Sequence, residues 1–230
     1  WGIGAITDPH GINIMDDEVY ITDRSDHVAV KFTLDGKPIQ VIGDRGVFSD
    51  TGCENPGDLC PRAAGPFNYC TEMSTSPSGD IYISDGYRNA RVHRFSRDGR
   101  LIHSWGQPGK ESPGEFHLVH SLLVDPDGKV YVCDRANRRV QIFSPEGEFI
   151  TMWTGMGGPD NIVRDNDAIF YIAEQADESG TSHLSIWNAD GRVLERWPIR
   201  HAHGLEVDAN GDIYLGLTIE QSVDKYVRQR

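Results

Sequence analysis

Residues 116–143 read FHLVHSLLVDPDGKVYVCDRANRRVQIF, and this stretch decides the fold. Its short runs of β-branched residues are broken by turn residues such as Pro126-Asp127-Gly128, which is typical of consecutive antiparallel strands. His120 opens the first run and Arg135 directly follows the second. Because a hairpin returns to the edge from which it started, we expect His120 and Arg135 at one edge of the sheet.

The same pattern occurs five times along the chain. Each copy has an inner strand, a turn, a second strand that usually ends in an acidic residue, and a third strand; in the first four a fourth run follows, such as PIQVIG or LIHSWG. The inner strands open at His10, Glu72, His120, Asp160 and His203. Four strands at a fixed phase predict an all-β protein, a β-propeller of four-stranded blades. We expect one propeller domain over residues 1–230, with a Cys-containing insertion at 44–69.

The two ends of the chain suggest the number of blades. The last copy has no fourth strand, and Trp1-Gly2 resembles Trp105-Gly106, where an outermost strand ends. We therefore expect six blades, with part of one blade missing upstream of residue 1, so that the domain is N-terminally incomplete. A five-bladed ring is the alternative.

Charge narrows the range of partners. The chain has 22 basic and 35 acidic residues and a formal net charge of −13. Nucleic acids and anionic membranes both require a basic surface, so we expect neither as a partner. No apolar run approaches the roughly 20 residues of a membrane helix. We expect a monomer that binds a small-molecule or peptide substrate.

Two of the four cysteines, Cys53 and Cys60, lie in the insertion. A disulfide between them would offset the entropy of ordering that loop. Two free thiols are the alternative, and a zinc site is less favoured because no second pair accompanies them. A disulfide would indicate an oxidising compartment, which means a secreted protein, the periplasm or the secretory lumen.

Three histidines share one phase of the repeat. His10, His120 and His203 open the inner strands of alternate copies, which lie a third of a turn apart in a six-bladed ring. Three imidazoles with one open position are a typical site for catalytic zinc. The alternative is three channel histidines bonded to nearby backbone. Glu72 and Asp160 could orient the imidazoles or line the channel. The other histidines fall at outer-strand or loop positions, or just before a strand, where solvated or packing roles suffice: His27, His93, His103, His117, His183 and His201.

The loops after the second strands carry a recurring Asp, Asn and Arg-Val, as in Asp85-Gly-Tyr-Arg-Asn-Ala-Arg-Val, and this pattern resembles the NHL repeat. Tyr87 and Arg135 do not repeat. Further motifs resemble the lyase domain of peptidylglycine α-amidating enzymes: Pro9-His10-Gly11, Ser84-Asp85-Gly86-Tyr87-x-Asn89, Pro113-Gly114-x-Phe116, Val119-His120-Ser121 and Asp134-Arg135. The resemblance runs from about His10 to Phe143 and resumes near His203. It implies a six-bladed propeller that holds zinc and cleaves a peptidyl-α-hydroxyglycine to an amide and glyoxylate.

Carried over by motif, the resemblance assigns His10, His120 and His203 as zinc ligands. It makes Tyr87 the catalytic general base and Arg135 an arginine that assists substrate and tyrosine. It also implies a calcium ion, to which Ile12 would contribute its backbone carbonyl.

Three features depart from the family. Gly204 stands where a calcium-binding aspartate follows the third histidine, and Arg88 stands where a cysteine bridges the counterpart of Cys70. A substrate-binding arginine of the family's first blade has no counterpart in this chain.

Three functions remain open from the sequence. The favoured one is a zinc-dependent carbon–nitrogen lyase acting on an α-hydroxy-amide. The alternatives are a non-catalytic NHL propeller that binds a protein or glycan, and a lactonase-type hydrolase, which commonly uses calcium with oxygen ligands. Three imidazoles favour a softer metal than calcium.

Overall fold

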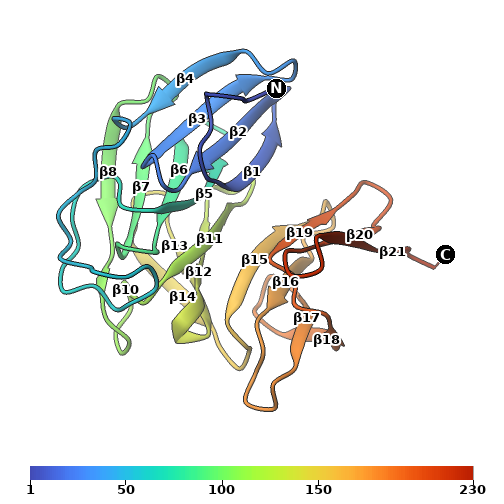
Figure 1. Ribbon diagram of the computed structural model, residues 1–230. Coiled ribbons are helices and arrows are strands. Elements are labelled where there is room, and N and C mark those ends of the chain that lie inside the picture. The colour runs from blue at the N-terminus through green and yellow to red at the C-terminus, as the bar shows by residue number, and fades with distance from the viewer. Residues whose placement is uncertain (230) are drawn as a thin grey trace.

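The computed structural model describes residues 1–229 and consists of small antiparallel sheets, each formed by strands that follow one another in the chain (Figure 1). The first sheet is β1 (Pro9–Met15), β2 (Glu18–Asp23), β3 (Val28–Thr33) and β4 (Pro38–Ile42). The second is β5 (Cys70–Thr75), β6 (Ile81–Asp85), β7 (Arg91–Phe95) and β8 (Leu101–Trp105). The third is β11 (Val119–Val124), β12 (Val130–Asp134), β13 (Arg139–Phe143) and β14 (Phe149–Trp153). The fourth is β15 (Pro159–Arg164), β16 (Phe170–Glu174), β17 (Ser182–Trp187) and β18 (Val193–Ile199). The fifth is β19 (Gly204–Val207), β20 (Ile213–Leu217) and β21 (Ser222–Tyr226).

Two short strands, β9 (Gln107–Pro108) and β10 (Glu115–Phe116), pair in parallel between the second and third sheets. A single 3₁₀ turn, η1 (Arg135–Asn137), follows β12. Within residues 1–229, no helix has the length and apolar character needed to cross a membrane.

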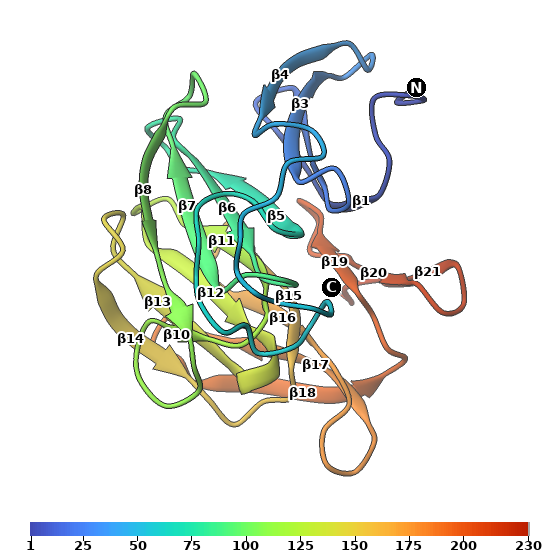
Figure 2. The same ribbon diagram turned by 60° about the vertical axis from the view of Figure 1, so that its left-hand side comes forward.

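The five sheets are arranged around a common centre (Figure 2). Their inner strands are neighbours in the order β1, β5, β11, β15 and β19, and they line a cavity of about 1060 Å³. This arrangement confirms the predicted β-propeller. The number of blades differs from the expected six, because the described chain supplies five sheets. Residues 1–8 form turns and a short bridge rather than a blade strand, and the Trp1 ring packs against Phe32 of the first sheet at 5.1 Å.

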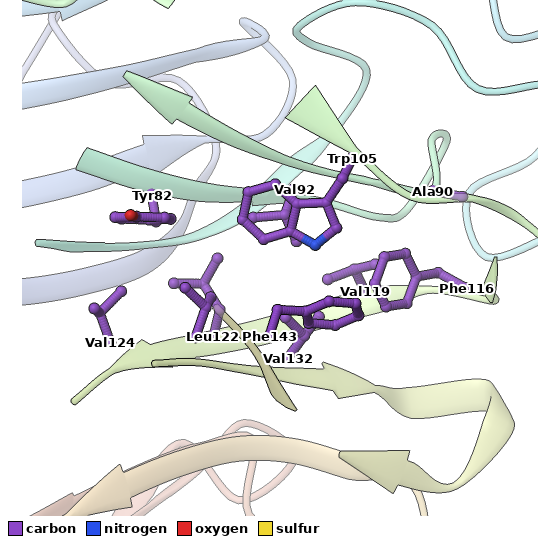
Figure 3. Close-up of a cluster of buried hydrophobic side chains, with 11 residues drawn as sticks. Tyr82, Ala90, Val92, Trp105, Phe116, Val119, Leu122, Val124, Val132 and Phe143 are labelled. Atoms are coloured by element: carbon purple, nitrogen blue, oxygen red, sulfur yellow. The ribbon is translucent and has the colours of Figure 1, made fainter. Parts of the chain in front are cut away.

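Apolar side chains between adjacent sheets hold the blades together. Figure 3 shows the cluster between the second and third sheets, where Trp105 of β8 lies against Phe116 and Phe143. Phe116 and Phe143 are almost fully buried, which contributes about 1.5–3 kcal/mol for each ring. Gly106, at φ +102, is needed beside them, because a Cβ there would come within 2.6 Å of the Phe116 ring.

Buried acidic residues at the ends of the second strands fix the segments that lead into the inner strands. The fully buried carboxylate of Asp134 accepts hydrogen bonds from the His117 backbone N–H, Asn137 Nδ2 and Arg139 Nε, each at 2.8 Å. The recurring Asp, Asn and Arg are therefore structural, and they hold in place the start of β11, which carries His120.

Candidate active site

A β-bulge lies at the start of each inner strand that carries His10, His120 or Asp160. In β11 the pairing shifts between Val119 and Ser121, so His120 is the extra residue of the bulge. The same shift falls between Pro9 and Ile12 in β1, which contains His10, and between Pro159 and Asn161 in β15, which contains Asp160. Bulges re-aim a side chain relative to the regular alternation of a strand, and they are common next to active sites. Here they direct His10 and His120 toward the channel.

The neighbouring sheet orients each of these two imidazoles. His10 Nδ1 lies 2.8 Å from the carbonyl oxygen of Thr71, and His120 Nδ1 lies 2.6 Å from that of Asp160. A carbonyl can only accept, so Nδ1 carries the proton and Nε2 keeps its lone pair. Thr71 is itself the bulge residue of β5, and Asp160 that of β15. Each histidine is thus fixed by the equivalent residue of the next blade.

The three histidines predicted to bind metal converge. One ring nitrogen from each of His10, His120 and His203 lies within 4.8 Å of the others. The ring centroids are 4.6–4.9 Å apart. His203 directly precedes β19, and within residues 1–229 its ring nitrogens make no hydrogen bond. Among the described residues, no other group of three potential metal ligands is found.

Burial keeps these imidazoles neutral. Desolvation, followed by the charge of His203, lowers the pKa of His10 to about 4. The pKa of His120 lies well below its ordinary value, with burial as the main cause and Arg135 as the next. The pKa of His203 is also lowered, again mainly by burial. Neutral imidazoles with free Nε2 lone pairs are the form that binds metal.

Tyr87 lies directly beside the triad. Its hydroxyl oxygen is 3.2 Å from His10 Nε2 and 3.1 Å from His120 Nε2. Gly86 permits this placement, because a Cβ there would overlap the backbone of Val119 at the start of β11. The guanidinium carbon of Arg135 lies 5.3 Å from the centroid of the Tyr87 ring. The structure therefore brings the two predicted catalytic residues to the predicted metal ligands.

The carboxylate of Asp160 joins several site residues. It is fully buried and accepts from Arg135 Nη1 at 2.9 Å and from Gln175 Nε2 at 3.2 Å. His201 Nε2 lies 2.9 Å from its other oxygen, and this contact raises the pKa of His201. Asp160 thus orients Arg135 through its side chain and His120 through its backbone.

The insertion at 44–69 holds the Tyr87 loop. The Gly57 N–H donates to the Tyr87 carbonyl at 2.6 Å, and the Thr51 hydroxyl donates to the Arg88 carbonyl at 2.6 Å. Arg88 in turn donates from Nε and Nη2 to the Cys53 carbonyl, at 3.1 and 2.6 Å. These contacts replace the disulfide that the family resemblance implies at this point.

Several sequence predictions need correction or remain open. Glu72 does not orient an imidazole: its carboxylate accepts from Asn13 and from the Met73 N–H, and Thr71 occupies the histidine phase instead. His201 is not a peripheral histidine, because it contacts Asp160. The calcium role of Ile12 stays a prediction. The cysteines are free thiols in this structure, and the predicted disulfide stays a prediction as well.

Sequence reasoning missed Arg24. Its guanidinium carbon lies 5.2 Å from the centroid of the Tyr87 ring. Arg24 follows Asp23 at the end of β2 just as Arg135 follows Asp134 at the end of β12, so Arg135 does have a counterpart in the repeat. That shared phase was the signal that could have identified it.

The donor set fits zinc. Three neutral imidazoles, two of them fixed by backbone carbonyls, face one point beside a hydroxyl group, and a fourth position is left for water or substrate. Calcium would require oxygen ligands, which this cluster lacks.

The comparisons with known proteins agree with this geometry. Residues 116–143 match the model of the NHL repeat. This segment is therefore an NHL repeat. The chain is 29% identical to human NHL repeat-containing protein 3 over 97% of this chain and 67% of that protein. It is 32% identical to peptidyl-alpha-hydroxyglycine alpha-amidating lyase 1 of Drosophila melanogaster, over 65% of this chain and 28% of that protein.

The chain also shares its fold with solved structures. A gluconolactonase from Xanthomonas campestris superposes with a TM-score of 0.68 at 13% identity, over 96% of this chain and 73% of that one. At this identity the likeness concerns the fold alone. The relatives thus include lyases and NHL-repeat proteins, and the structural neighbours include a lactonase.

Proposed function

We propose that this chain is the catalytic propeller of a zinc-dependent lyase that cleaves an N-acyl-α-hydroxyglycine to an amide and glyoxylate. The observation that carries the proposal is the Tyr87 hydroxyl, which lies within hydrogen-bonding distance of two histidines of a converging triad. A packed loop tyrosine has no need of that position. The similarity to an amidating lyase supports the same reading.

The chain's own residues account for the proton transfers. Tyr87, as the general base, takes the proton of the substrate's α-hydroxyl. The carbon–oxygen double bond forms as the carbon–nitrogen bond breaks, and the electron pair passes to nitrogen. Tyr87 then returns the proton to that nitrogen, which leaves a neutral amide and glyoxylate.

Other groups stabilise the charges in this reaction. The guanidinium groups of Arg24 and Arg135 lie beside the Tyr87 ring and stabilise negative charge on the phenol oxygen. Zinc, when bound by His10, His120 and His203, would polarise a substrate oxygen and stabilise the developing negative charge. Asp160 holds Arg135 and His120 in place throughout.

The two alternative functions lack such an observation. A lactonase-type hydrolase with calcium would need a cluster of oxygen ligands, but the channel carboxylate of Glu72 is engaged by Asn13 and the Met73 N–H. A non-catalytic binding module would leave unexplained why two bulged histidines and two arginines meet at one tyrosine.

Metal analysis with a product assay tests the proposal. We expect about one zinc per chain in the wild type and release of glyoxylate from an N-acyl-α-hydroxyglycine. His120→Ala should lose both, whereas His103→Ala, an exposed histidine that stacks on Trp105, should keep both. A folded wild type that binds no zinc, or that binds zinc and releases no glyoxylate, would contradict the proposal.

A further inference from the structure

Arg24 is placed like a site residue rather than a surface residue. It is the repeat counterpart of Arg135, and the two guanidinium carbons lie 5.2 and 5.3 Å from the centroid of the Tyr87 ring. The first and third sheets thus each contribute one cation to the ring that lies beside the histidines. Cationic groups at this distance from an aromatic centroid interact with it favourably.

Arg24 and Arg135 differ in their hydrogen bonds, and the difference decides which of them can bind a ligand. Arg135 is directed at the buried carboxylate of Asp160, and its side chain is 12% exposed. Arg24 is 32% exposed and donates from Nε and Nη2 to Asp8, at 3.0 and 3.3 Å. Asp8 also accepts from the Ser25 hydroxyl at 2.6 Å. Within residues 1–229, Nη1 of Arg24 makes no hydrogen bond. Asp8 therefore fixes the orientation of the guanidinium and leaves one N–H₂ group available.

A role in stability alone does not explain why Arg24 lies beside Tyr87. Partly exposed ion pairs such as Arg24–Asp8 contribute only about 0–1 kcal/mol to stability. The chain as a whole carries a formal charge of −13, yet two arginines lie beside the Tyr87 ring. A local positive field attracts an anion, and a guanidinium group matches the geometry of a carboxylate.

We propose that Arg24 binds the carboxylate of the substrate and makes the site selective for acids over their neutral esters. This inference rests on the proposed lyase function, because it names the residue that recognises the glycine-derived carboxylate. It assigns to the first sheet a specificity-determining residue, while Asp8 acts as a positioning residue that holds the guanidinium toward Tyr87.

Calorimetric binding to the zinc-loaded protein tests this assignment without turnover. The probes are N-benzoylglycine, which lacks the α-hydroxyl and cannot react, and its methyl ester. We expect the wild type to prefer the acid, and Arg24→Gln to weaken acid binding by about 10- to 100-fold with ester binding unchanged. Asp8→Asn, which keeps the guanidinium, should retain the preference for the acid.

Arg45→Gln is the matched control, because Arg45 also pairs with an aspartate, Asp26, but lies outside the site. It should bind both probes like the wild type. The inference is wrong if the wild type binds neither probe or shows no preference for the acid. It is also wrong if Arg24→Gln keeps the preference, or weakens both probes equally, as a structural residue would. The two proposals can also fail separately. If Arg24→Gln loses the preference for the acid but the wild type releases no glyoxylate, the lyase proposal is refuted and the anion site stands.

Discussion

The Tyr87 hydroxyl is the one acid–base group within hydrogen-bonding distance of two of the converging imidazoles, as far as residues 1–229 describe them. Its ring lies beside two arginines, and its backbone is held by the insertion. Tyr87 therefore lies beside the histidines, has two positively charged groups next to its ring, and has a backbone that the insertion holds in place. Two predictions belong to this scale.

Tyr87→Phe removes the hydroxyl and keeps the ring. We expect kcat to fall by about 10²- to 10⁴-fold, the range for loss of a general acid–base group, while the zinc content stays unchanged. Tyr20→Phe is the control, because within residues 1–229 the Tyr20 hydroxyl bonds only to Glu18 of the same strand, away from the site. Retention of kcat in Tyr87→Phe would remove this tyrosine from the mechanism.

The histidines should make the stability of the metal-free protein depend on pH. The pKa of His10 is about 4 in the folded state and near 6.5 in the unfolded chain, so the unfolded chain takes up the proton first as the pH falls. The free energy of unfolding should therefore decrease as the pH falls from about 6.5 toward about 4. Urea unfolding of chelator-treated protein across this range measures the slope. His10→Gln should show a smaller slope, and an equal slope in both proteins would contradict the assignment.

At the scale of strands and loops, the site depends on how closely the inner strands approach one another. Gly11, next to His10, faces the backbone of β5, where a Cβ would come within 2.5 Å of the Thr71 carbonyl oxygen. This is the same carbonyl that orients His10. The glycine thus sets the distance over which one blade orients the imidazole of the next.

Gly11→Ala should force β1 away from β5. We expect a loss of about 1–3 kcal/mol of stability, as for other overpacked sites, together with weaker zinc binding because the His10–Thr71 contact is broken. Gly65→Ala is the matched control, since a Cβ at Gly65 meets no atom within 4 Å. Thermal melts and zinc titration compare the two, and identical behaviour of both variants would show that the close approach is unimportant.

The insertion at 44–69 allows a second prediction at the scale of loops. The sulfur atoms of Cys53 and Cys60 lie 3.6 and 3.7 Å from the same Asp58 carbonyl oxygen, so the two thiols are neighbours. We expect oxidised glutathione to join them in a disulfide by thiol–disulfide exchange, with roughly 2–3 kcal/mol of stabilisation for a loop of this size. Alkylation and mass spectrometry of the folded protein would identify the bridge. The buried Cys70 and Cys133 serve as internal controls. Alkylation of all four cysteines after denaturation would show that no disulfide had formed.

Strand order was readable from the sequence because turn residues, and an acidic residue at the end of the first four second strands, recur at a fixed phase. The histidine triad followed from the same phase. What the sequence did not reveal are features without a periodic signal. The bulge of β5 places Thr71, rather than Glu72, at the position equivalent to His10 and His120, and no residue pattern marks that one-residue shift. The contacts of His201 with Asp160 and of Gly57 with Tyr87 join distant segments, so they depend on loop conformation.

For the whole molecule, the triad connects sheets that are not adjacent. His10, His120 and His203 come from the first, third and fifth sheets, so a bound metal would tie most of the ring together. Zinc at 100 times its Kd should stabilise the folded state by about 2.7 kcal/mol. We expect zinc to raise the Tm of the wild type and to leave that of His203→Ala unchanged, with His103→Ala responding like the wild type. A rise of equal size in His203→Ala would show that zinc binds elsewhere.

The distribution of the three ligands along the chain also sets the order of events during synthesis. His10 leaves the ribosome first, His120 follows after the second repeat, and His203 emerges only after the fourth repeat has been made. Domains generally fold as units during translation. A nascent chain therefore displays two of the three imidazoles long before the third, and capture of a metal by all three reports that the segment from the first to the fifth repeat has been made.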